Sequence, residues 1–327
     1  MQYAHQVSRW LILGVFCSLA AVLAACSAGT EGGGNANAST GTQIIATSNI
    51  AADLIQQVAG DTFAVKSLIP RGSDPHAYTP GPRDVAAVAD ADLVFTIGLD
   101  YEQAWLKKLL KSASVDSTRM VMLGDYVKTI PSSGSLHDDE DEGEGESHQP
   151  GAADPHFWLD PREVKRILPV IVDRLAARTP AAREALVRNA NAFERQLDDL
   201  HAWITQAAAA VPAERRLLVT AHESLGYFGS AYGFRIVGSV IPGVSTTREP
   251  TAAELAKLVG DIKQLRAPAI FGETILDARL AKRISEEAGV KLVTGLHTDS
   301  LGQPGSATGS YLSMMRTTAS TIFDALR

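Results

Sequence analysis

The sequence contains few cysteines, no excess of basic residues and only one long apolar run. Two of its 327 residues are cysteines, which excludes both a disulfide framework and a zinc site built from four thiolates. The formal net charge of −7 excludes a nucleic-acid-binding protein that relies on a basic face. The apolar run, residues 10–23, is shorter than the ~20 residues that a membrane-spanning helix requires. A membrane protein with many spans is therefore excluded as well.

The apolar run has the features of an N-terminal export signal. It follows the basic residue Arg9 and ends in Leu-Ala-Ala-Cys at residues 23–26. This ending resembles the bacterial lipobox, in which the cysteine is acylated and becomes the first residue; an ordinary secretory signal is the alternative. We expect a lipoprotein signal peptide over residues 1–25, lipidation of Cys26, and a flexible tether over residues 26–42. The protein would then be exported and anchored by lipid to the bacterial cell membrane, facing the periplasm or the outside.

From residue 43 onward, short β-rich runs alternate with stretches of helical spacing. Strands are expected at 44–47, 64–69, 93–97, 120–123, 217–220, 236–241, 269–271 and 291–294. Helices are expected at 50–59, 82–89, 101–112, 224–232, 251–265, 277–288 and 310–326. This alternation is typical of parallel sheets with crossover helices. The predicted fold class is α/β with two (β/α) lobes, each holding a mostly parallel four-stranded sheet: an N-terminal lobe over residues 43–179 and a C-terminal lobe over residues 212–327.

Residues 180–211, between the lobes, have the composition and spacing of a helix. The stretch is rich in alanine, and its apolar residues recur every three or four positions, at Leu186, Phe193, Leu197, Leu200 and Ile204. One helix of about 30 residues would reach roughly 45 Å and join the lobes stiffly. Two or three shorter helices within one lobe are the alternative.

Residues 131–153 differ from the rest of the N-terminal lobe in composition. Seven acidic residues fall within positions 138–146, a run that cannot pack and that predicts a disordered, solvated loop. His137 and His148 flank these acids. The two histidines could serve as accessory metal-capture residues, and a plain solvated loop is the alternative.

Three histidines and one aspartate lie in distinctive contexts. His76 and His156 each follow Asp-Pro, while His222 and Asp299 follow expected strands. The separations of 80, 66 and 77 residues form no local motif, so spacing alone defines no site. However, His76, His222 and Asp299 all follow the carboxyl ends of expected strands, where open α/β sheets bind ligands. A ligand held by all four would lie between the lobes, and this donor set suits Zn²⁺, with Mn²⁺ as the alternative.

These motifs resemble those of a known family, the zinc/manganese solute-binding lipoproteins of bacterial ABC importers. The similar motifs are Asp-Pro-His-Ala-Tyr at 74–78, Asp-Pro-His-Phe-Trp-Leu-Asp-Pro at 154–161, His222 five residues before Tyr-Phe, and Thr-Asp-Ser-Leu-Gly at 298–302. The resemblance covers residues 43–327. It implies two (β/α) lobes bridged by one long helix and a metal bound between them by His76, His156, His222 and Asp299. It also implies delivery of the metal to a membrane permease, and we expect the protein to be a monomer.

The resemblance also bears on which metal is bound. An acidic loop that contains histidines is similar to one in zinc-binding members, but two histidines are fewer than such members typically have. Members with glutamate in place of His222 tend to bind manganese, so the histidine favours zinc.

Two other functional classes remain open at this point. An exported zinc hydrolase would use three histidine ligands, an open water position and a base such as Glu223. Position 226 is glycine, however, so the second histidine of His-Glu-x-x-His is missing, and we predict that the chain is not an enzyme. A metal-independent surface adhesin is the third possibility. Glu273 ends an expected strand, and we expect it to make a structural hydrogen bond.

Overall fold

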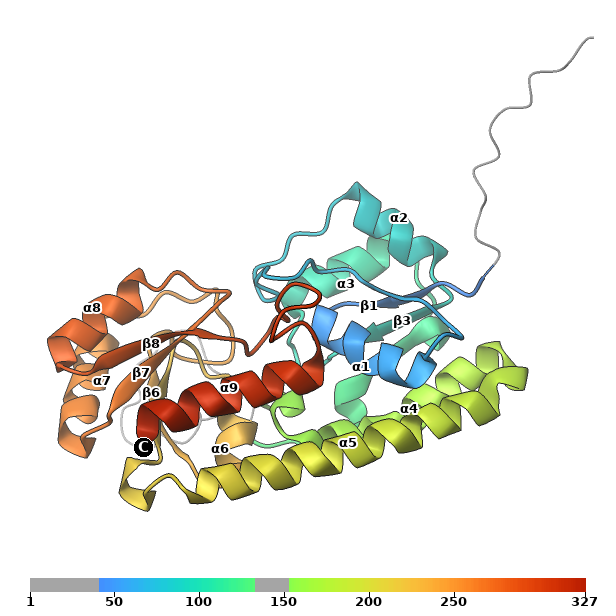
Figure 1. Cartoon of the computed structure of the whole chain (residues 1–327). Helices are drawn as coiled ribbons and strands as arrows, with labels where there is room; N and C mark the ends of the chain where they lie inside the picture. Colours follow the sequence, from blue (N-terminus) through green and yellow to red (C-terminus); the bar gives the residue numbers. More distant parts are fainter. Residues whose placement is uncertain (1–40, 133–152) are drawn as a thin grey trace, which may run out of the picture. The chain divides into compact units, whose positions relative to one another are not determined.

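The computed structural model describes residues 41–132 and 153–327 (Figure 1). The expected signal peptide, Cys26 and residues 26–40 of the expected tether lie outside the described residues, as do His137 and His148. Among the described residues, no helix is long and apolar enough to cross a membrane.

The first sheet has four parallel strands, ordered β2-β1-β3-β4 in the described part of the chain. The strands are β1 (Ile44–Ala46), β2 (Val65–Ser67), β3 (Leu93–Thr96) and β4 (Met120–Met122). Successive strands are connected by α1 (Asn49–Ala59), α2 (Pro82–Asp90) and α3 (Gln103–Ser112). Helix α1 begins after Ser48, because the Ser48 hydroxyl accepts a hydrogen bond from the amide of Ala51 and caps the first turn.

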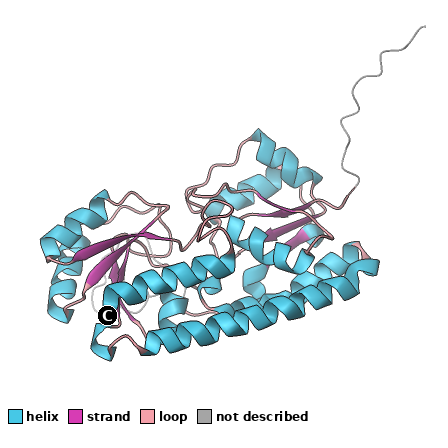
Figure 2. Cartoon of the chain, in the orientation of Figure 1, coloured by secondary structure: helices cyan, strands magenta, loops and turns pink. Residues whose placement is uncertain are grey.

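The second sheet repeats this arrangement, with four parallel strands ordered β6-β5-β7-β8 among the described residues. The strands are β5 (Leu217–Thr220), β6 (Arg235–Ser239), β7 (Ala269–Glu273) and β8 (Lys291–Leu296), connected by α6 (Gly226–Tyr232), α7 (Ala252–Leu265) and α8 (Arg279–Ala288). Figure 2 shows the two sheets as separate groups of strands. The predicted α/β fold class with two four-stranded parallel sheets is confirmed.

Three helices pack together along the two sheets: α4 (Pro161–Arg178), α5 (Arg183–Ala209) and α9 (Tyr311–Leu326). Helix α5 is continuous over 27 residues, a length of about 40 Å at 1.5 Å per residue. It runs from one lobe to the other with α9 beside it (Figure 1). The expected single connecting helix is therefore confirmed. Its buried face contains the five apolar residues that predicted it: Leu186, Phe193, Leu197, Leu200 and Ile204.

The largest buried cluster is shared by the two lobes. It joins Phe95 of β3, Phe193 of α5, Phe271 of β7 and Phe323 of α9 in one continuous core. Two smaller clusters pack the opposite face of each sheet against its own crossover helices. Both sheets are thus covered on both faces, as parallel sheets require. The largest cluster therefore joins the two lobes, and the loops that follow the strands lie where the lobes meet.

Candidate metal centre

The structure brings His76, His156, His222 and Asp299 together from four separate segments. His76 lies in the loop after β2, His156 precedes the 3₁₀ turn Phe157–Leu159, His222 follows β5, and Asp299 follows β8. All four residues are at most 2% exposed. One donor atom from each lies within 4.8 Å of the donor atoms of the other three. Residues remote in sequence therefore form one buried cluster.

The two Asp-Pro-His motifs make the same local turn. The carboxylate of Asp74 accepts a hydrogen bond from the backbone amide of His76 at 2.9 Å. The carboxylate of Asp154 accepts one from the amide of His156, also at 2.9 Å. In each motif the intervening proline restricts the backbone between aspartate and histidine. The repeated sequence thus presents two imidazoles from two rigid turns.

The outer nitrogen of each imidazole faces an oxygen atom of the kind that accepts hydrogen bonds. His76 Nδ1 lies 3.2 Å from the carbonyl oxygen of Tyr101, and His156 Nδ1 lies 2.8 Å from Asp154 Oδ1. His222 Nδ1 lies 2.6 Å from Glu273 Oε2. When an imidazole is neutral and donates through Nδ1, its Nε2 lone pair faces the interior of the cluster, which is the state that metal binding requires. This orientation is the one that metal-ligating histidines adopt.

The inward-facing atoms are spaced as ligands around a small cation. His156 Nε2 lies 3.1 Å from Asp299 Oδ1 and 3.3 Å from His222 Nε2. The distance from His222 Nε2 to Asp299 Oδ2 is 3.5 Å, and that from His76 Nε2 to Asp299 Oδ1 is 3.8 Å. A tetrahedral zinc site with bonds of about 2.0–2.1 Å places its ligand atoms about 3.3–3.4 Å apart. The cluster is therefore close to the size of such a site.

Two of the inward-facing atoms are buried without a hydrogen-bond partner among the described residues. These atoms are His76 Nε2 and Asp299 Oδ1. Leaving a buried polar atom unpaired costs about 1–3 kcal/mol, and more for a charged group. His156 Nε2 and His222 Nε2 also face each other, at 3.3 Å. A cation at the centre would satisfy all of these atoms at once.

The electrostatics of the cluster are dominated by burial and by its carboxylates. Burial lowers the pKa of His76 to about 3. Burial also lowers the pKa of His156, but the carboxylates of Asp299 and Asp154 outweigh it and raise the pKa to about 10. For Asp299, burial raises the pKa, yet the neighbouring imidazoles outweigh it and hold the pKa below its usual value. The site thus keeps an ionised carboxylate in a buried space, which favours binding of a cation.

The groups that contact the outer nitrogens of the imidazoles were not predicted from the sequence. Glu273 ends β7 as expected, but it contacts the His222 ring in addition to accepting hydrogen bonds from Ser224 and Thr298. Its place at the carboxyl end of a strand was a usable signal. Tyr101 holds His76 through a backbone carbonyl, a group that every residue has, so the sequence offered no signal for it.

The fold and the site together define the class of protein. Two parallel α/β lobes, a long connecting helix and a buried cluster of donors between the lobes are the features of a two-lobed solute-binding protein. The chain belongs to the family described as zinc-uptake complex component A, periplasmic, whose family model matches residues 44–325. The resemblance found in the sequence motifs is confirmed.

Several individual proteins are similar to this chain over nearly its whole length. The manganese-binding lipoprotein MntA of Halalkalibacterium halodurans is 32% identical over 95% of this chain and 97% of its own length. The manganese ABC transporter substrate-binding lipoprotein PsaA of Streptococcus pneumoniae is 30% identical over 93% of this chain and 94% of its own. Among solved structures, the periplasmic zinc binding protein TroA from Treponema pallidum aligns with a TM-score of 0.77 and 27% identity, covering 88% of this chain and 99% of TroA.

These relatives decide between the functional classes that the sequence left open. They are named for metal binding or substrate binding, not for catalysis. The prediction that the chain is not an enzyme is confirmed, and the zinc-hydrolase alternative is abandoned. The chain is a metal-binding protein of the substrate-binding type.

Proposed function

We propose that this protein captures a divalent transition-metal ion outside the cytoplasm and delivers it to the membrane permease of an ABC importer. The proposed ligands are His76, His156, His222 and Asp299. The main support is that His76 Nε2 and Asp299 Oδ1 are buried without a hydrogen-bond partner in the described part of the chain. A cation bound between them would give both atoms a partner. The names of MntA and PsaA support the role in transport.

The arrangement suits a carrier because the proposed ligands are enclosed. All four are buried, and together they supply four protein donors around one point. A tetrahedral ion held by four protein donors has no open position for a reactive water, in contrast to a catalytic zinc site. We infer that the ion is coordinated by protein atoms alone and that it is released when these protein ligands move.

Zn²⁺ is the proposed cargo. Three imidazole nitrogens and one carboxylate oxygen suit Zn²⁺ better than Mn²⁺, which favours oxygen-rich sites with more ligands. The donor atoms also form a compact set: four of the distances between them are 3.1–3.8 Å, and one donor from each residue lies within 4.8 Å of the others. The similar protein TroA is named for zinc binding, which agrees with this assignment.

Mn²⁺ is the second candidate, because MntA and PsaA carry manganese in their names. Most nitrogen and oxygen sites bind Zn²⁺ more tightly than Mn²⁺, so affinity alone does not identify the physiological cargo. Metal analysis of the protein purified from its native host, combined with competition between Zn²⁺ and Mn²⁺, decides the question. Stoichiometric zinc supports the proposal, whereas stoichiometric manganese would assign the second candidate.

Titration calorimetry with Zn²⁺ tests the proposed ligands. We expect the wild-type protein to bind one ion tightly and the His76→Ala/His222→Ala double variant to lose that binding. His201→Ala is the matched control, because His201 lies on α5 and contacts the Tyr232 hydroxyl instead of the cluster. Wild-type affinity in the double variant would rule out this site.

We further propose that residues 1–25 are a signal peptide, that Cys26 carries the lipid anchor and that the protein is a monomer. The lipobox-like ending at residues 23–26 and the lipoprotein names of the relatives support the anchor. Cell fractionation tests it, since Cys26→Ser should move the protein from the membrane fraction to the soluble fraction. Retention of this variant in the membrane would contradict lipidation at Cys26.

A further inference from the structure

The segment that carries Asp299 is bonded to the opposite lobe. By sequence it belongs to the C-terminal lobe, because it directly follows β8. Yet the indole of Trp158 donates to the carbonyl of Thr298 at 2.7 Å, and the hydroxyl of Tyr311 donates to the carbonyl of Trp158 at 2.6 Å. In Figure 1 the loop between β8 and α9 extends to the side of α1. Residues 298–311 are therefore held against the N-terminal lobe.

Asn49 makes the closest connection to the turn after Asp299. It is the first residue of α1 and is 4% exposed. Its side-chain oxygen accepts a hydrogen bond from the amide of Leu301 at 2.7 Å, and its side-chain amide donates to the hydroxyl of Ser300 at 3.1 Å. Ser300 and Leu301 directly follow Asp299, so Asn49 fixes the backbone turn that begins at the carboxylate.

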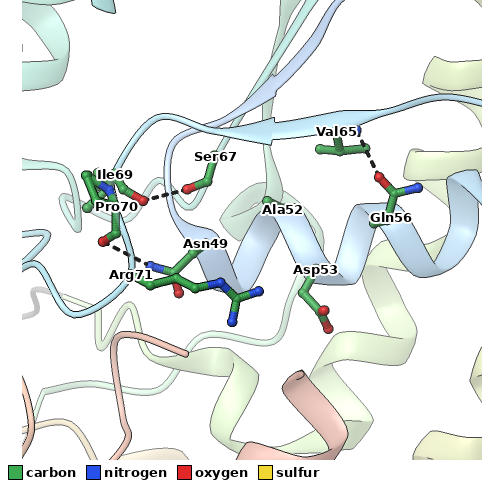
Figure 3. A pocket seen from close by; sticks show the side chains of 9 residues that line it. All are labelled: Asn49, Ala52, Asp53, Gln56, Val65, Ser67, Ile69, Pro70 and Arg71. Carbon is green, nitrogen blue, oxygen red and sulfur yellow. Dashed lines mark hydrogen bonds between the residues drawn. The ribbon is translucent and has the colours of Figure 1, made fainter. Parts of the chain in front are cut away.

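The same side chain also reaches the loop that leads to His76. The Asn49 amide contacts the carbonyl of Pro70 at 3.5 Å, as Figure 3 shows, and the Ser300 hydroxyl accepts a hydrogen bond from the amide of Gly72 at 2.7 Å. Arg71, next along this loop, donates to carbonyls of the 302–309 loop. One buried side chain thus joins the first turn of α1, the loop before His76 and the turn after Asp299.

This junction links the segments that carry two proposed ligands. His76 Nε2 and Asp299 Oδ1 lie 3.8 Å apart and have no hydrogen bond to each other or to another described group. Asp299 Oδ1 lies 3.1 Å from His156 Nε2, and the Thr298 hydroxyl donates to Asp299 Oδ2 at 2.7 Å. Neither of these contacts involves His76. Asn49, by contrast, contacts both the loop before His76 and the turn after Asp299.

We propose that Asn49 is a positioning residue of the metal site, which holds the Asp299 turn against the His76 loop. This inference rests on the proposed ligand set. Asp299 then acts together with His76 and His156 on the N-terminal lobe, and His222 is the one proposed ligand that the C-terminal lobe supplies. Loss of the Asn49 side chain lets the carboxylate shift, which changes the coordination geometry and speeds release of the metal.

Two measurements on the full chain test the role of Asn49: the visible spectrum of bound Co²⁺, which reports coordination geometry, and the rate of Zn²⁺ transfer to a chelator. We expect Asn49→Ala to alter the Co²⁺ spectrum and to speed Zn²⁺ release by about tenfold or more, the effect typical of losing an outer-shell contact. Ser300→Ala should produce the same changes to a smaller degree, because it removes one of the two Asn49 contacts to the turn after Asp299 and leaves the bond to the Leu301 amide.

Asn189→Ala is the matched control. Asn189 lies on α5 and donates to the carbonyl of Val58, near the other end of α1, at 3.1 Å. This variant should keep the wild-type spectrum and release rate. A wild-type spectrum and rate in Asn49→Ala would overturn the proposal, as would equal changes in Asn189→Ala. If Asn49→Ala fails to fold in a thermal melt, Ser300→Ala decides by the same criteria.

Asp299→Ala in the same series separates this inference from the proposed function. A wild-type Co²⁺ spectrum in Asp299→Ala would show that the ligand set is wrong, and the role of Asn49 would fall with it. If Asp299→Ala loses the spectrum while Asn49→Ala and Ser300→Ala keep it, the ligand set stands and only the role of Asn49 is wrong.

Discussion

At the scale of single residues, the three imidazoles of the cluster differ in what lies behind them. His156 and His222 each have a carboxylate at the outer nitrogen, whereas His76 has the carbonyl of Tyr101. A carboxylate partner raises the basicity of a metal-bound imidazole and fixes its orientation. His156 and His222 should therefore be the stronger donors, and His76 the weaker one.

Glu273 provides the most direct test of whether a carboxylate at the outer nitrogen strengthens metal binding. Glu273→Gln keeps the shape of the side chain and one oxygen but removes the negative charge 2.6 Å from His222 Nδ1. We expect Zn²⁺ affinity to fall about 10- to 100-fold, as measured by competition with a chelator of known affinity. Glu287→Gln, at an exposed position on α8, is the control and should bind as the wild type does. Equal affinities in the two variants would show that the charge of Glu273 plays no part.

At the scale of elements, α5 holds the two lobes in one core. Its apolar face is buried along the length of the helix, from Leu186 to Ile204. Each fully buried aliphatic or aromatic side chain contributes about 1.5–3 kcal/mol through removal from water. The packing of α5 therefore joins both lobes in one hydrophobic core.

Shortening a side chain on the buried face of α5 should lower the stability of both lobes together. Leu200 is fully buried, and Leu200→Ala should lower the free energy of unfolding by about 2–5 kcal/mol, because it leaves a cavity in the shared core. Val187→Ala on the same helix is the control: Val187 is 39% exposed, and its truncation should change stability by at most about 0.5 kcal/mol. Urea unfolding measures both values, and a similar loss in the two variants would contradict the packing described for α5.

The elements also show what the sequence could and could not predict. The strand–helix alternation and the periodic apolar face of α5 follow from local patterns, and both were predicted close to their observed bounds. Whether residues 180–211 form one helix or several was left open, because the same periodicity describes both. The outer partners of the imidazoles were harder to predict: Glu273 meets His222 across 51 residues of sequence, and Tyr101 uses only its backbone. Such contacts depend on the packing of strands, which no local pattern encodes.

At the scale of the whole molecule, the proposed ligands belong to both lobes. His76 and His156 come from the N-terminal lobe, and His222 comes from the C-terminal lobe. A bound ion would therefore cross-link the lobes in addition to filling the cluster. Because a ligand that binds only the folded state stabilises it, metal loading should be visible in global unfolding.

Thermal unfolding with and without metal tests this coupling. A saturating excess of Zn²⁺ at about 100 times the dissociation constant should stabilise the protein by about 2.7 kcal/mol and raise its Tm, and a chelator should reverse the shift. The His76→Ala/His222→Ala variant should show no shift. An unchanged Tm in the wild-type protein would contradict tight binding of Zn²⁺ to the folded chain.

The position of the ion itself tests the account most directly. Anomalous diffraction from crystals of the zinc-loaded protein should show one strong peak at the centre of the cluster. That peak should lie about 2.0–2.2 Å from the Nε2 atoms of His76, His156 and His222 and from a carboxylate oxygen of Asp299. A zinc peak elsewhere, or one of these four side chains turned away from the ion in the loaded molecule, would contradict the account.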